Sequence, residues 1–269
     1  MSDATNPGAP RGARRRALVT GASQGIGRGI ALSLADAGMD LALVARGREG
    51  LDATVAQAAP RTDGAVVALT ADLAVREESA ALAERAAEAL GGVPDVFVHC
   101  SGIARNGAVG SLEVAEWDRS MEVNVTSAFV IASDLVPAMR EQGWGRIVTI
   151  CSLYSRYAVS HTAAYASSKH ALHGLTRVLA AELAGHGGTA NAIMPGWVDT
   201  EMVRGEAAKA AAARGATPEE MVRKFLRNQP INRMVDTSEV GALTAFLCSD
   251  AAAAINGQGI NIDGGSVQS

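Results

Sequence analysis

Short apolar runs alternate with longer amphipathic stretches along the whole of this 269-residue chain. Apolar runs bounded by turn residues are typical of buried strands, and an apolar period of 3.6 residues is typical of helices. The runs predict about seven strands, at residues 17–20, 41–45, 65–69, 95–99, 146–152, 190–193 and 259–262. Because strand and helix alternate without a break in composition, we expect residues 16–269 to form one α/β domain with a doubly wound parallel sheet and helices on both faces.

Two segments stand apart from this alternation. Residues 1–15 are rich in Pro, Gly and Arg, which predicts a flexible tail; a basic arm that contacts a polyanion is the alternative. Residues around 201–229 are charged, rich in alanine and helical, with no strand signal. An insertion of this kind at the carboxyl edge of a sheet commonly forms a substrate lid.

A glycine-rich turn, G-A-S-Q-G-I-G at residues 21–27, joins the first predicted strand to a helical pattern. Strand, glycine turn and helix in this order predict a Rossmann-like βαβ unit that binds a dinucleotide. Gly21 permits the sharp turn, Gly25 lets the backbone approach a pyrophosphate, and Gly27 lets helix and strand pack closely. The alternative is a plain tight turn.

The end of the second predicted strand bears on which dinucleotide binds. An acidic residue there selects NAD, whereas an arginine accommodates the 2′-phosphate of NADP. The strand ends in Arg46, with Arg48 close by; Asp40 stands at the other end of the strand, and Glu49 follows both arginines. Because guanidinium matches phosphate in charge and geometry, we expect NADP(H) in preference to NAD(H). An exposed loop arginine is the alternative for Arg46.

Two further strand ends carry polar side chains. Asp72 follows the third predicted strand, at the edge where open α/β sheets bind ligands. It could cap the following helix, accept a hydrogen bond from an adenine amine, or do both. Ser152 places a hydroxyl at the end of the fifth predicted strand.

Tyr165 and Lys169 lie four residues apart in Y-A-S-S-K. In a helix this spacing places both side chains on one face, one turn apart. A positive charge beside a phenol favours the phenolate, so the pair could donate or accept a proton near neutral pH. The alternative is that Tyr165 and Lys169 are ordinary solvated surface residues, which is the usual case when no other motif in a chain indicates a catalytic site.

Charge and cysteine content exclude several classes of protein. The formal net charge of −4 argues against nucleic acid as a partner, because phosphate binding needs a basic face, and no apolar run has the length of a membrane span. Cys100, Cys151 and Cys248 are scattered, which predicts reduced thiols in a cytoplasmic protein. We expect no metal site, since no third ligand joins His170 and His173, and no base is placed to activate Cys151 as a nucleophile.

The ordered set of T-G-A-S-Q-G-I-G, D-L, Asn124, Ser152, Y-A-S-S-K and P-G-W-V-D-T resembles the short-chain dehydrogenase/reductase family. The resemblance extends from about residue 16 to 265 and rests on the order and spacing of these motifs. Within the family, H-T-A-A-Y-A-S-S-K-H and A-R-G-R-E-G-L look most like bacterial ketoreductases that act on acyl thioesters or aromatic polyketides.

The resemblance implies a role for each polar residue of the site. Tyr165 would exchange a proton with the substrate oxygen, Lys169 would tune that phenol and hydrogen-bond the nicotinamide ribose, and Ser152 would hold the carbonyl oxygen. Asn124 would position a water that links Lys169 to solvent. The implied cofactor-binding residues are Gly21, Ser23, Gln24, Gly25, Ile26, Gly27, Arg46, Asp72, Leu73, Ser101, Gly102, Tyr165, Lys169, Pro195, Gly196, Val198 and Thr200.

The resemblance also implies an activity and an assembly. We expect hydride transfer from NADPH to a ketone, in a homotetramer or homodimer built on helices around residues 122–139 and 165–183. The alternatives are an NAD-linked dehydrogenase that oxidises a secondary alcohol, and a cofactor-binding protein without turnover. Because Asn124, Ser152, Tyr165 and Lys169 are all present, the last alternative is disfavoured.

One motif departs from the family. Where the family commonly has N-N-A-G after the fourth strand, this chain has His99, Cys100, Ser101 and Gly102. Gly102 retains the close approach to a cofactor and Ser101 is still small. The missing asparagine side chains would have braced the neighbouring backbone, so we expect the departure to affect stability or the geometry on the nicotinamide side.

Overall fold

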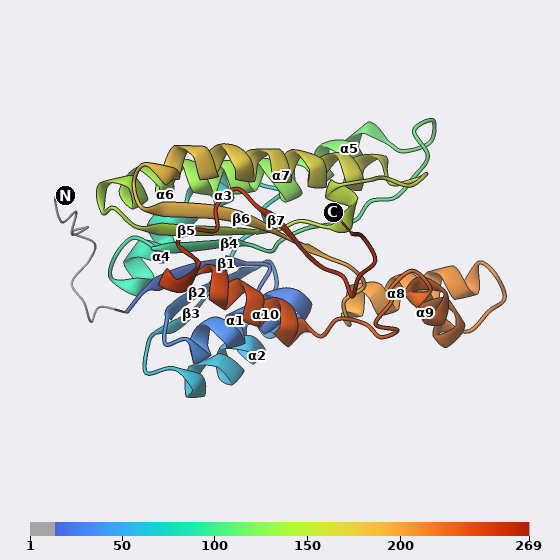
Figure 1. The fold of residues 1–269 in the computed structure, drawn as a ribbon, viewed down its shortest axis with the longest axis horizontal. Coiled ribbons are helices and arrows are strands. Elements are labelled where there is room, and N and C mark those ends of the chain that lie inside the picture. Colours follow the sequence, from blue (N-terminus) through green and yellow to red (C-terminus); the bar gives the residue numbers. More distant parts are fainter. Residues whose placement is uncertain (1–13, 269) are drawn as a thin grey trace.

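A seven-stranded sheet runs through the part of the chain that the computed structural model describes, residues 14–268 (Figure 1). The strand order is β3-β2-β1-β4-β5-β6-β7, and every neighbouring pair is parallel. The strands are β1 (Arg16–Thr20), β2 (Asp40–Ala45), β3 (Val66–Thr70), β4 (Val96–His99), β5 (Gly145–Ile150), β6 (Gly188–Pro195) and β7 (Gly259–Ile262). The order reverses between β1 and β4, which is where open α/β sheets bind ligands. The doubly wound α/β fold is confirmed.

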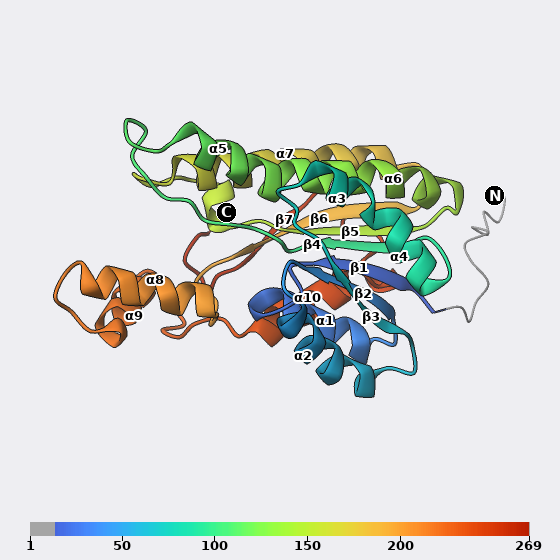
Figure 2. The ribbon, with the colours of Figure 1, turned by 180° about the vertical axis from the view of Figure 1, so that it is seen from behind.

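Helices cover both faces of the sheet, as Figures 1 and 2 show. On one face lie α1 (Gly25–Asp36), α2 (Arg48–Ala58) and α10 (Thr237–Leu247). On the other lie α4 (Leu82–Leu90), α6 (Ser127–Glu141) and α7 (Ala163–Ala184), with the short α3 (Arg76–Ala80) and α5 (Val114–Met121) beside them. Right-handed crossovers between parallel strands require helices on both sides of such a sheet.

The strands are apolar on both faces because each face contacts a separate core. In β1, Val19 points into the core formed with α1 and α10, while its neighbour Leu18 points into the core formed with α4, α6 and α7. Successive side chains of a strand point to opposite faces, so one short apolar run supplies both cores. This explains why the runs in the sequence are continuous.

Two predicted strand boundaries differ from the structure, and one helical stretch is interrupted. The strand expected at 146–152 ends at Ile150, so Ser152 follows the sheet in extended backbone and begins a short 3₁₀ turn, Leu153–Ser155. The strand expected at 190–193 is longer, Gly188–Pro195, and buried throughout. Between β3 and β4 the helical stretch is broken at Ala81 into α3 and α4. Pairing with buried neighbours, and not local propensity, sets these limits.

A π-helical turn, Glu122–Thr126, interrupts the helical stretch between Val114 and Glu141. We call this segment the π-turn; it joins α5 to α6 and carries Asn124 at its centre. A π-turn inserts a residue into the helical repeat and disturbs its hydrogen bonds, and such turns are frequent at functional sites. Hydrophobic periodicity does not predict it.

The segment expected to form a lid consists of two helices, α8 (Glu201–Ala212) and α9 (Pro218–Leu226). In both views they extend from the carboxyl edge of the sheet (Figures 1 and 2). A small core of their own holds them together, with Ala207, Ala211 and Met221 buried. A capping box of Thr217 and Glu220 begins α9. Closure of this pair over a ligand stays a prediction.

Most of the predicted N-terminal tail, residues 1–13, lies outside the described residues. The two tail residues that are described contact the domain. The Arg15 guanidinium lies 3.7 Å from the centre of the Trp144 ring and 3.6 Å from the carboxylate of Asp95. Within residues 14–268, none of the helices has the length and apolar character needed to cross a membrane.

Candidate functional site

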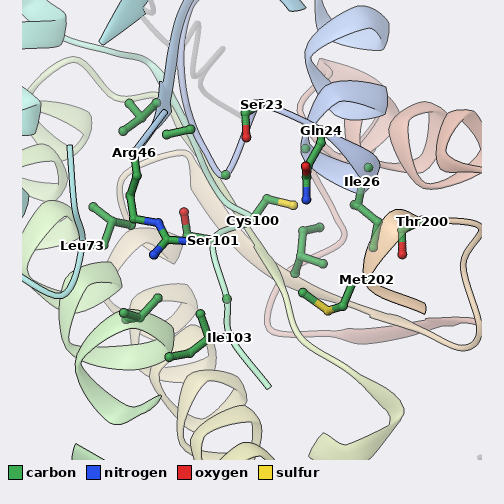
Figure 3. A pocket seen from close by; sticks show the side chains of 18 of the residues that line it. Ser23, Gln24, Ile26, Arg46, Leu73, Cys100, Ser101, Ile103, Thr200 and Met202 are labelled. Atoms are coloured by element: carbon green, nitrogen blue, oxygen red, sulfur yellow. The ribbon is translucent and has the colours of Figure 1, made fainter. Parts of the chain in front are cut away.

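A pocket of about 600 Å³ opens at the carboxyl ends of the central strands (Figure 3). Its volume is in the range of small-molecule and cofactor sites. Most residues predicted to bind the cofactor line it: Gly21, Ser23, Gln24, Gly25, Ile26, Gly27, Arg46, Asp72, Leu73, Ser101, Gly102, Tyr165, Lys169 and Thr200. Three others, Pro195, Gly196 and Val198, lie outside its wall, so their part in binding stays a prediction.

The glycine turn forms one end of the pocket because side chains are excluded there. Gly21 has a φ of +69°, and a Cβ on it would lie 2.9 Å from the backbone nitrogen of Ser101. A Cβ on Gly27 would collide with the carbonyl of Gly21. The turn therefore lies directly against the segment after β4 and the first turn of α1. The first turn of α1 contains no acidic residue, so its free N–H groups suit a phosphate.

Arg46 and Arg48 differ in their surroundings. Arg48 donates a hydrogen bond of 2.8 Å to the carboxylate of Asp52, one turn along α2. Arg46 lines the pocket, and its side chain points into it, near Ser101 (Figure 3). No carboxylate in the described part of the chain forms an ion pair with Arg46, so its guanidinium is available to an anionic ligand.

Asp72 supports the turn that follows β3. Its carboxylate accepts a hydrogen bond of 3.0 Å from the Ala74 nitrogen and lies 3.9 Å from the Arg119 guanidinium. Its own nitrogen donates to the Glu78 carboxylate at 2.8 Å. The residue before α3 is Val75, which makes no side-chain cap. Asp72 thus stabilises the turn and not the helix end, while it still faces the pocket.

Lys169, Tyr165, Gly102 and Asn124 meet at the other end of the pocket. The Lys169 ammonium is almost fully buried, donates a hydrogen bond of 2.8 Å to the Ile150 carbonyl, and lies 5.8 Å from the centre of the Tyr165 ring. A Cβ on Gly102 would lie 3.2 Å from the lysine nitrogen and 3.5 Å from the Asn124 oxygen. The helical spacing therefore does place the phenol and the ammonium beside one another.

Asn124 is fully buried, and its side chain joins three segments. Its Oδ1 accepts from the Ile103 nitrogen at 2.8 Å, and its Nδ2 donates to the Ile103 carbonyl at 3.0 Å and to the Ser168 hydroxyl at 2.9 Å. Ser168 in turn donates to the Tyr165 carbonyl. Both amide hydrogens are used, so the side chain can bind a water only through its oxygen.

Ser152 lies beyond the end of β5, half-buried, and its hydroxyl accepts a hydrogen bond of 3.2 Å from the Tyr154 nitrogen. The Tyr154 ring packs edge-on against Tyr165, with centroids 6.1 Å apart, and against Tyr157 at 5.4 Å. Burial, the two neighbouring phenols and Glu206 raise the pKa of Tyr154. Tyr154 therefore presents a neutral aromatic surface beside Tyr165.

Residues 99–102, which lack the asparagines of the family pattern, are held by a side chain of β1. The hydroxyl of Thr20 accepts hydrogen bonds from the nitrogens of Cys100 and Ser101, both at 3.2 Å, and lies 3.2 Å from His99 Nδ1. Thr20 thus braces backbone that an asparagine would hold in the family pattern. Burial, with Lys169 nearby, lowers the pKa of His99 to about 3. Burial raises the pKa of the Cys100 thiol to about 12.

The other candidate groups are inert by their environment. Burial raises the pKa of the Cys151 thiol, so the thiolate needed for a nucleophile is disfavoured. His170 bonds the Ala166 carbonyl through Nδ1. Burial and neighbouring cations lower the pKa of His173 to about 4. No group of three His, Cys, Asp or Glu side chains within residues 14–268 is arranged to hold a metal ion.

Several residues that the structure brings to the site carry only weak signals in the sequence. Arg105, Arg119 and Met202 line the pocket, but nothing in their spacing marks them. Thr20 ends β1, and Tyr154 follows Ser152 by two residues; a hydroxyl at a strand end and an aromatic beside the predicted serine could have suggested both. Their positions depend on contacts between segments far apart in the chain.

Comparisons with known proteins agree with this geometry. A family model described as enoyl-(acyl carrier protein) reductase matches residues 21–267. The chain is 34% identical over 253 residues to a D-beta-hydroxybutyrate dehydrogenase of Rhizobium meliloti (strain 1021), covering 93% of this chain and 98% of that protein. It is 31% identical over 252 residues to an acetoacetyl-CoA reductase of Allochromatium vinosum, covering 93% and 98%.

Solved structures extend the comparison to the fold. A variant of actinorhodin polyketide ketoreductase, crystallised with NADPH, superposes with a TM-score of 0.88 at 36% sequence identity, covering 94% of this chain and 97% of that one. The match includes the parallel sheet and nearly all of the described chain. The chain therefore belongs to the short-chain dehydrogenase/reductase family, whose oxidoreductases bind a nicotinamide cofactor.

Proposed function

We propose that this protein reduces a ketone to a secondary alcohol with NADPH. The observation that carries the proposal is the meeting of Lys169, Asn124 and Gly102 at one end of a pocket that Tyr165 also lines. Phosphate-binding features lie at the other end, in the glycine turn and Arg46. A cofactor that spans the pocket would therefore place its reactive end beside the phenol.

The residues of the chain supply the proton and the polar contacts, and the nicotinamide cofactor, when bound, supplies the hydride. The Tyr165 hydroxyl donates its proton to the substrate oxygen, and the nearby Lys169 ammonium stabilises the phenolate that remains. The Ser152 hydroxyl donates a hydrogen bond to the same oxygen and stabilises its developing negative charge. For alcohol oxidation the proton moves in the opposite direction, from substrate to Tyr165.

The pocket fits a nicotinamide dinucleotide, and the preference for NADP(H) is supported by Arg46. Gly21 and Gly25 both have positive φ angles, and a Cβ on Gly21 would meet the backbone of Cys100 and Ser101; close approach to a pyrophosphate requires such a backbone. Arg46 enters the pocket without a carboxylate partner among the described residues, whereas Arg48 is held by Asp52. A guanidinium there favours a 2′-phosphate.

A substrate of the acyl-thioester or polyketide type is supported by the relatives and by the surface beside Tyr165. One relative is named an acetoacetyl-CoA reductase and a structural neighbour is a polyketide ketoreductase. Tyr154 packs against the reactive phenol, and the helical pair α8 and α9 stands at the same edge of the sheet. These helices would close over an extended, partly apolar ketone.

Oxidation of a hydroxy acid is the second candidate, and one observation favours it. The relative from Rhizobium meliloti is named a D-beta-hydroxybutyrate dehydrogenase, and it matches 93% of this chain. The same Tyr165, Lys169 and Ser152 would serve that reaction, so the geometry of the site does not separate the two directions. The cofactor preference separates the two reactions, because NAD has no 2′-phosphate for Arg46 to bind.

A rate measurement tests the proposal. Purified protein is mixed with NADPH or NADH and with acetoacetyl-CoA, a polycyclic aromatic ketone or a sugar ketone, and consumption of reduced cofactor is followed. We expect turnover of one of the first two ketones with a higher kcat/KM for NADPH. Cofactor binding without reduction of any ketone would reject the enzyme. Oxidation of 3-hydroxybutyrate with NAD, without ketone reduction by NADPH, would establish the second candidate instead.

We further propose a homotetramer or homodimer in a reducing, cytoplasmic environment. Phe129 on α6 and Val178 on α7 are both more than half exposed, and apolar groups on these helices suit an interface between copies. The three cysteines are free. Light scattering after gel filtration gives the mass of the assembly, and a monomer would contradict this part of the proposal.

A further inference from the structure

Arg105 is a cation of the pocket wall to which the proposed reaction assigns no role. It lies in the segment after β4, and its side chain is 48% exposed. Its Nε lies 2.8 Å from the carboxylate of Glu116 on α5. Neither Nη1 nor Nη2 makes a hydrogen bond within residues 14–268, so one edge of the guanidinium can donate to a ligand.

The residues before Arg105 are held at the end of the pocket where Lys169 lies. A Cβ on Gly102 would lie 3.2 Å from the Lys169 nitrogen. The Ile103 nitrogen donates a hydrogen bond of 2.8 Å to the side-chain oxygen of Asn124. Three residues span at most about 10 Å, so the backbone of Arg105 lies within that distance of Gly102.

The residues after Arg105 are held at the start of α7. Gly107 forms a parallel bridge with Thr162, and its nitrogen donates a hydrogen bond of 2.8 Å to the His161 carbonyl. Thr162 precedes Tyr165 by three residues. Arg105 is therefore in the middle of a segment that runs from the buried ammonium to the first turn of the helix that carries the phenol.

The other cations of the pocket wall have partners or assigned roles. Four cationic side chains and one carboxylate, that of Asp72, line the pocket, although the whole chain has a formal net charge of −4. Arg119 lies 3.9 Å from Asp72, and the Lys169 ammonium donates to a backbone carbonyl. Arg46 is assigned to the 2′-phosphate of the cofactor. The positive charge of Arg105 is left for a second anion.

Glu116 orients the guanidinium of Arg105. The carboxylate oxygen nearest to Nε is itself buried, so this edge of the guanidinium is held against α5. A guanidinium binds a carboxylate or a phosphate through two parallel N–H groups, and Nη1 and Nη2 provide such a pair. An exposed ion pair contributes little to folding stability, so stability alone gives no reason for an arginine in the pocket wall.

We propose that Arg105 binds an anionic group of the ketone substrate and makes the enzyme prefer a charged ketone to its neutral analogue. The anion is the carboxylate of a short oxo acid or a phosphate of a coenzyme A thioester, since both present the oxygen pair that a guanidinium binds. The preference among substrates rests on the proposed ketone reduction, whereas binding of the anion requires no turnover.

Two matched pairs of ketones test the preference and distinguish the two anions. Acetoacetate is compared with its methyl ester, and acetoacetyl-CoA with the neutral N-acetylcysteamine thioester of acetoacetate, each with NADPH. We expect the wild-type kcat/KM to be roughly 10- to 100-fold higher for the charged member of at least one pair. The pair that shows the preference identifies the anion, and equal values within both pairs would overturn the proposal.

Variants of Arg105 assign the preference to its side chain. Arg105→Gln should lose the preference and keep the wild-type kcat/KM for the neutral ketone within about 2-fold, and Arg105→Lys, which keeps the charge but not the paired N–H groups, should be intermediate. The matched control is Arg61→Gln, because Arg61 pairs with Asp36 at 2.9 Å on the surface. A preference retained in Arg105→Gln, or equal losses for charged and neutral ketones, would overturn the proposal. If Arg105→Gln does not fold, Arg105→Lys decides.

Calorimetry separates the anion site from the reaction. Acetoacetate and coenzyme A are titrated into wild-type and Arg105→Gln protein saturated with NADP. We expect one of them to bind, with a dissociation constant roughly 10- to 100-fold higher in the variant. Binding that depends on Arg105 without reduction of any ketone would reject the proposed function and retain the site. Ketone reduction without a preference or binding that depends on Arg105 would reject the site and retain the function.

Discussion

Trp197 and Phe225 stack face to face, with ring centroids 4.3 Å apart and an angle of 8° between the ring planes. Trp197 lies in the segment after β6, and Phe225 lies on α9. Gln229 strengthens the connection, because its amide oxygen accepts from the Trp197 nitrogen at 3.0 Å. The helical pair α8 and α9 is thus attached to the sheet through an aromatic contact near the pocket.

The first prediction concerns this contact. In Trp197→Ala the helices lose their attachment, so we expect a higher KM for the ketone and little change in the KM for NADPH. An aromatic pair contributes about 0.5–1.5 kcal/mol, which corresponds to roughly 2- to 10-fold in KM. Steady-state kinetics with each substrate varied in turn provides the measurement. Phe246→Ala, which removes an exposed aromatic of α10, is the control. Equal effects on both substrates would contradict a lid.

The second prediction concerns the proton donor. Tyr165→Phe removes the hydroxyl and keeps the ring that packs against Tyr154. We expect kcat to fall roughly 100- to 10,000-fold, the range of general acid catalysis, while NADPH binding measured by fluorescence is almost unaffected. Tyr157→Phe removes an exposed phenol of the same aromatic group and should retain activity. Substantial turnover by Tyr165→Phe would assign proton transfer to another group.

The third prediction concerns cofactor choice. Arg46→Ala should lower kcat/KM for NADPH roughly 10- to 100-fold, because a hydrogen bond to a charged group contributes about 1.5–3 kcal/mol. The value for NADH should change little, since NADH has no 2′-phosphate. Arg48→Ala, whose guanidinium is held by Asp52, is the matched control. An unchanged ratio of the two cofactors in Arg46→Ala would remove the basis for the NADP preference.

The fourth prediction concerns the glycine turn. A Cβ on Gly27 would meet the backbone of Gly21 and Ala22, and backbone cannot rotate away as a side chain can. We expect Gly27→Ala to lower the free energy of unfolding by about 1–3 kcal/mol and to weaken cofactor binding. Gly174→Ala, in α7 with open space around the site, should raise it by about 0.5–1 kcal/mol. Denaturant titration of both variants would show the difference, and equal stabilities would refute the close packing.

The fifth prediction concerns pH and His173. This histidine is 5% exposed, and burial followed by Arg177 and Arg156 lowers its pKa to about 4. Between about pH 6.5 and pH 4 the unfolded chain binds a proton at this site and the folded protein does not. The free energy of unfolding should therefore fall as the pH decreases through this window. Replacing His173 with Gln should make the fall less steep.

Thermal or denaturant unfolding at several pH values measures that slope. His170→Gln, which removes an exposed histidine from the same helix, is the matched control. The same loss of slope in both variants would contradict the assignment to burial of His173.

The alternation of strand and helix was predictable because β1 to β7 are short apolar runs that contact a core on each face. The glycine turn, Arg46, Tyr165 and Lys169 were predictable because their chemistry depends on local spacing or on the end of one strand. The ends of β5 and β6 and the break at Ala81 were not, because pairing and packing between distant segments decide where a strand or helix ends.

The sequence by itself determined the parallel α/β architecture, the glycine turn at residues 21–27 and the helical pairing of Tyr165 with Lys169, because each follows from periodicity or from residues close together in the chain. Only the tertiary structure decided that no carboxylate among residues 14–268 pairs with Arg46 whereas Asp52 pairs with Arg48, and that Thr20 braces the segment after β4. It alone brought the His99 ring to the Thr20 hydroxyl, with 3.2 Å between Nδ1 and Oγ1. The hydrogen bonds of Thr20 join β1 to β4 and to the segment after it, and bonds between segments so far apart form only when the sheet is assembled.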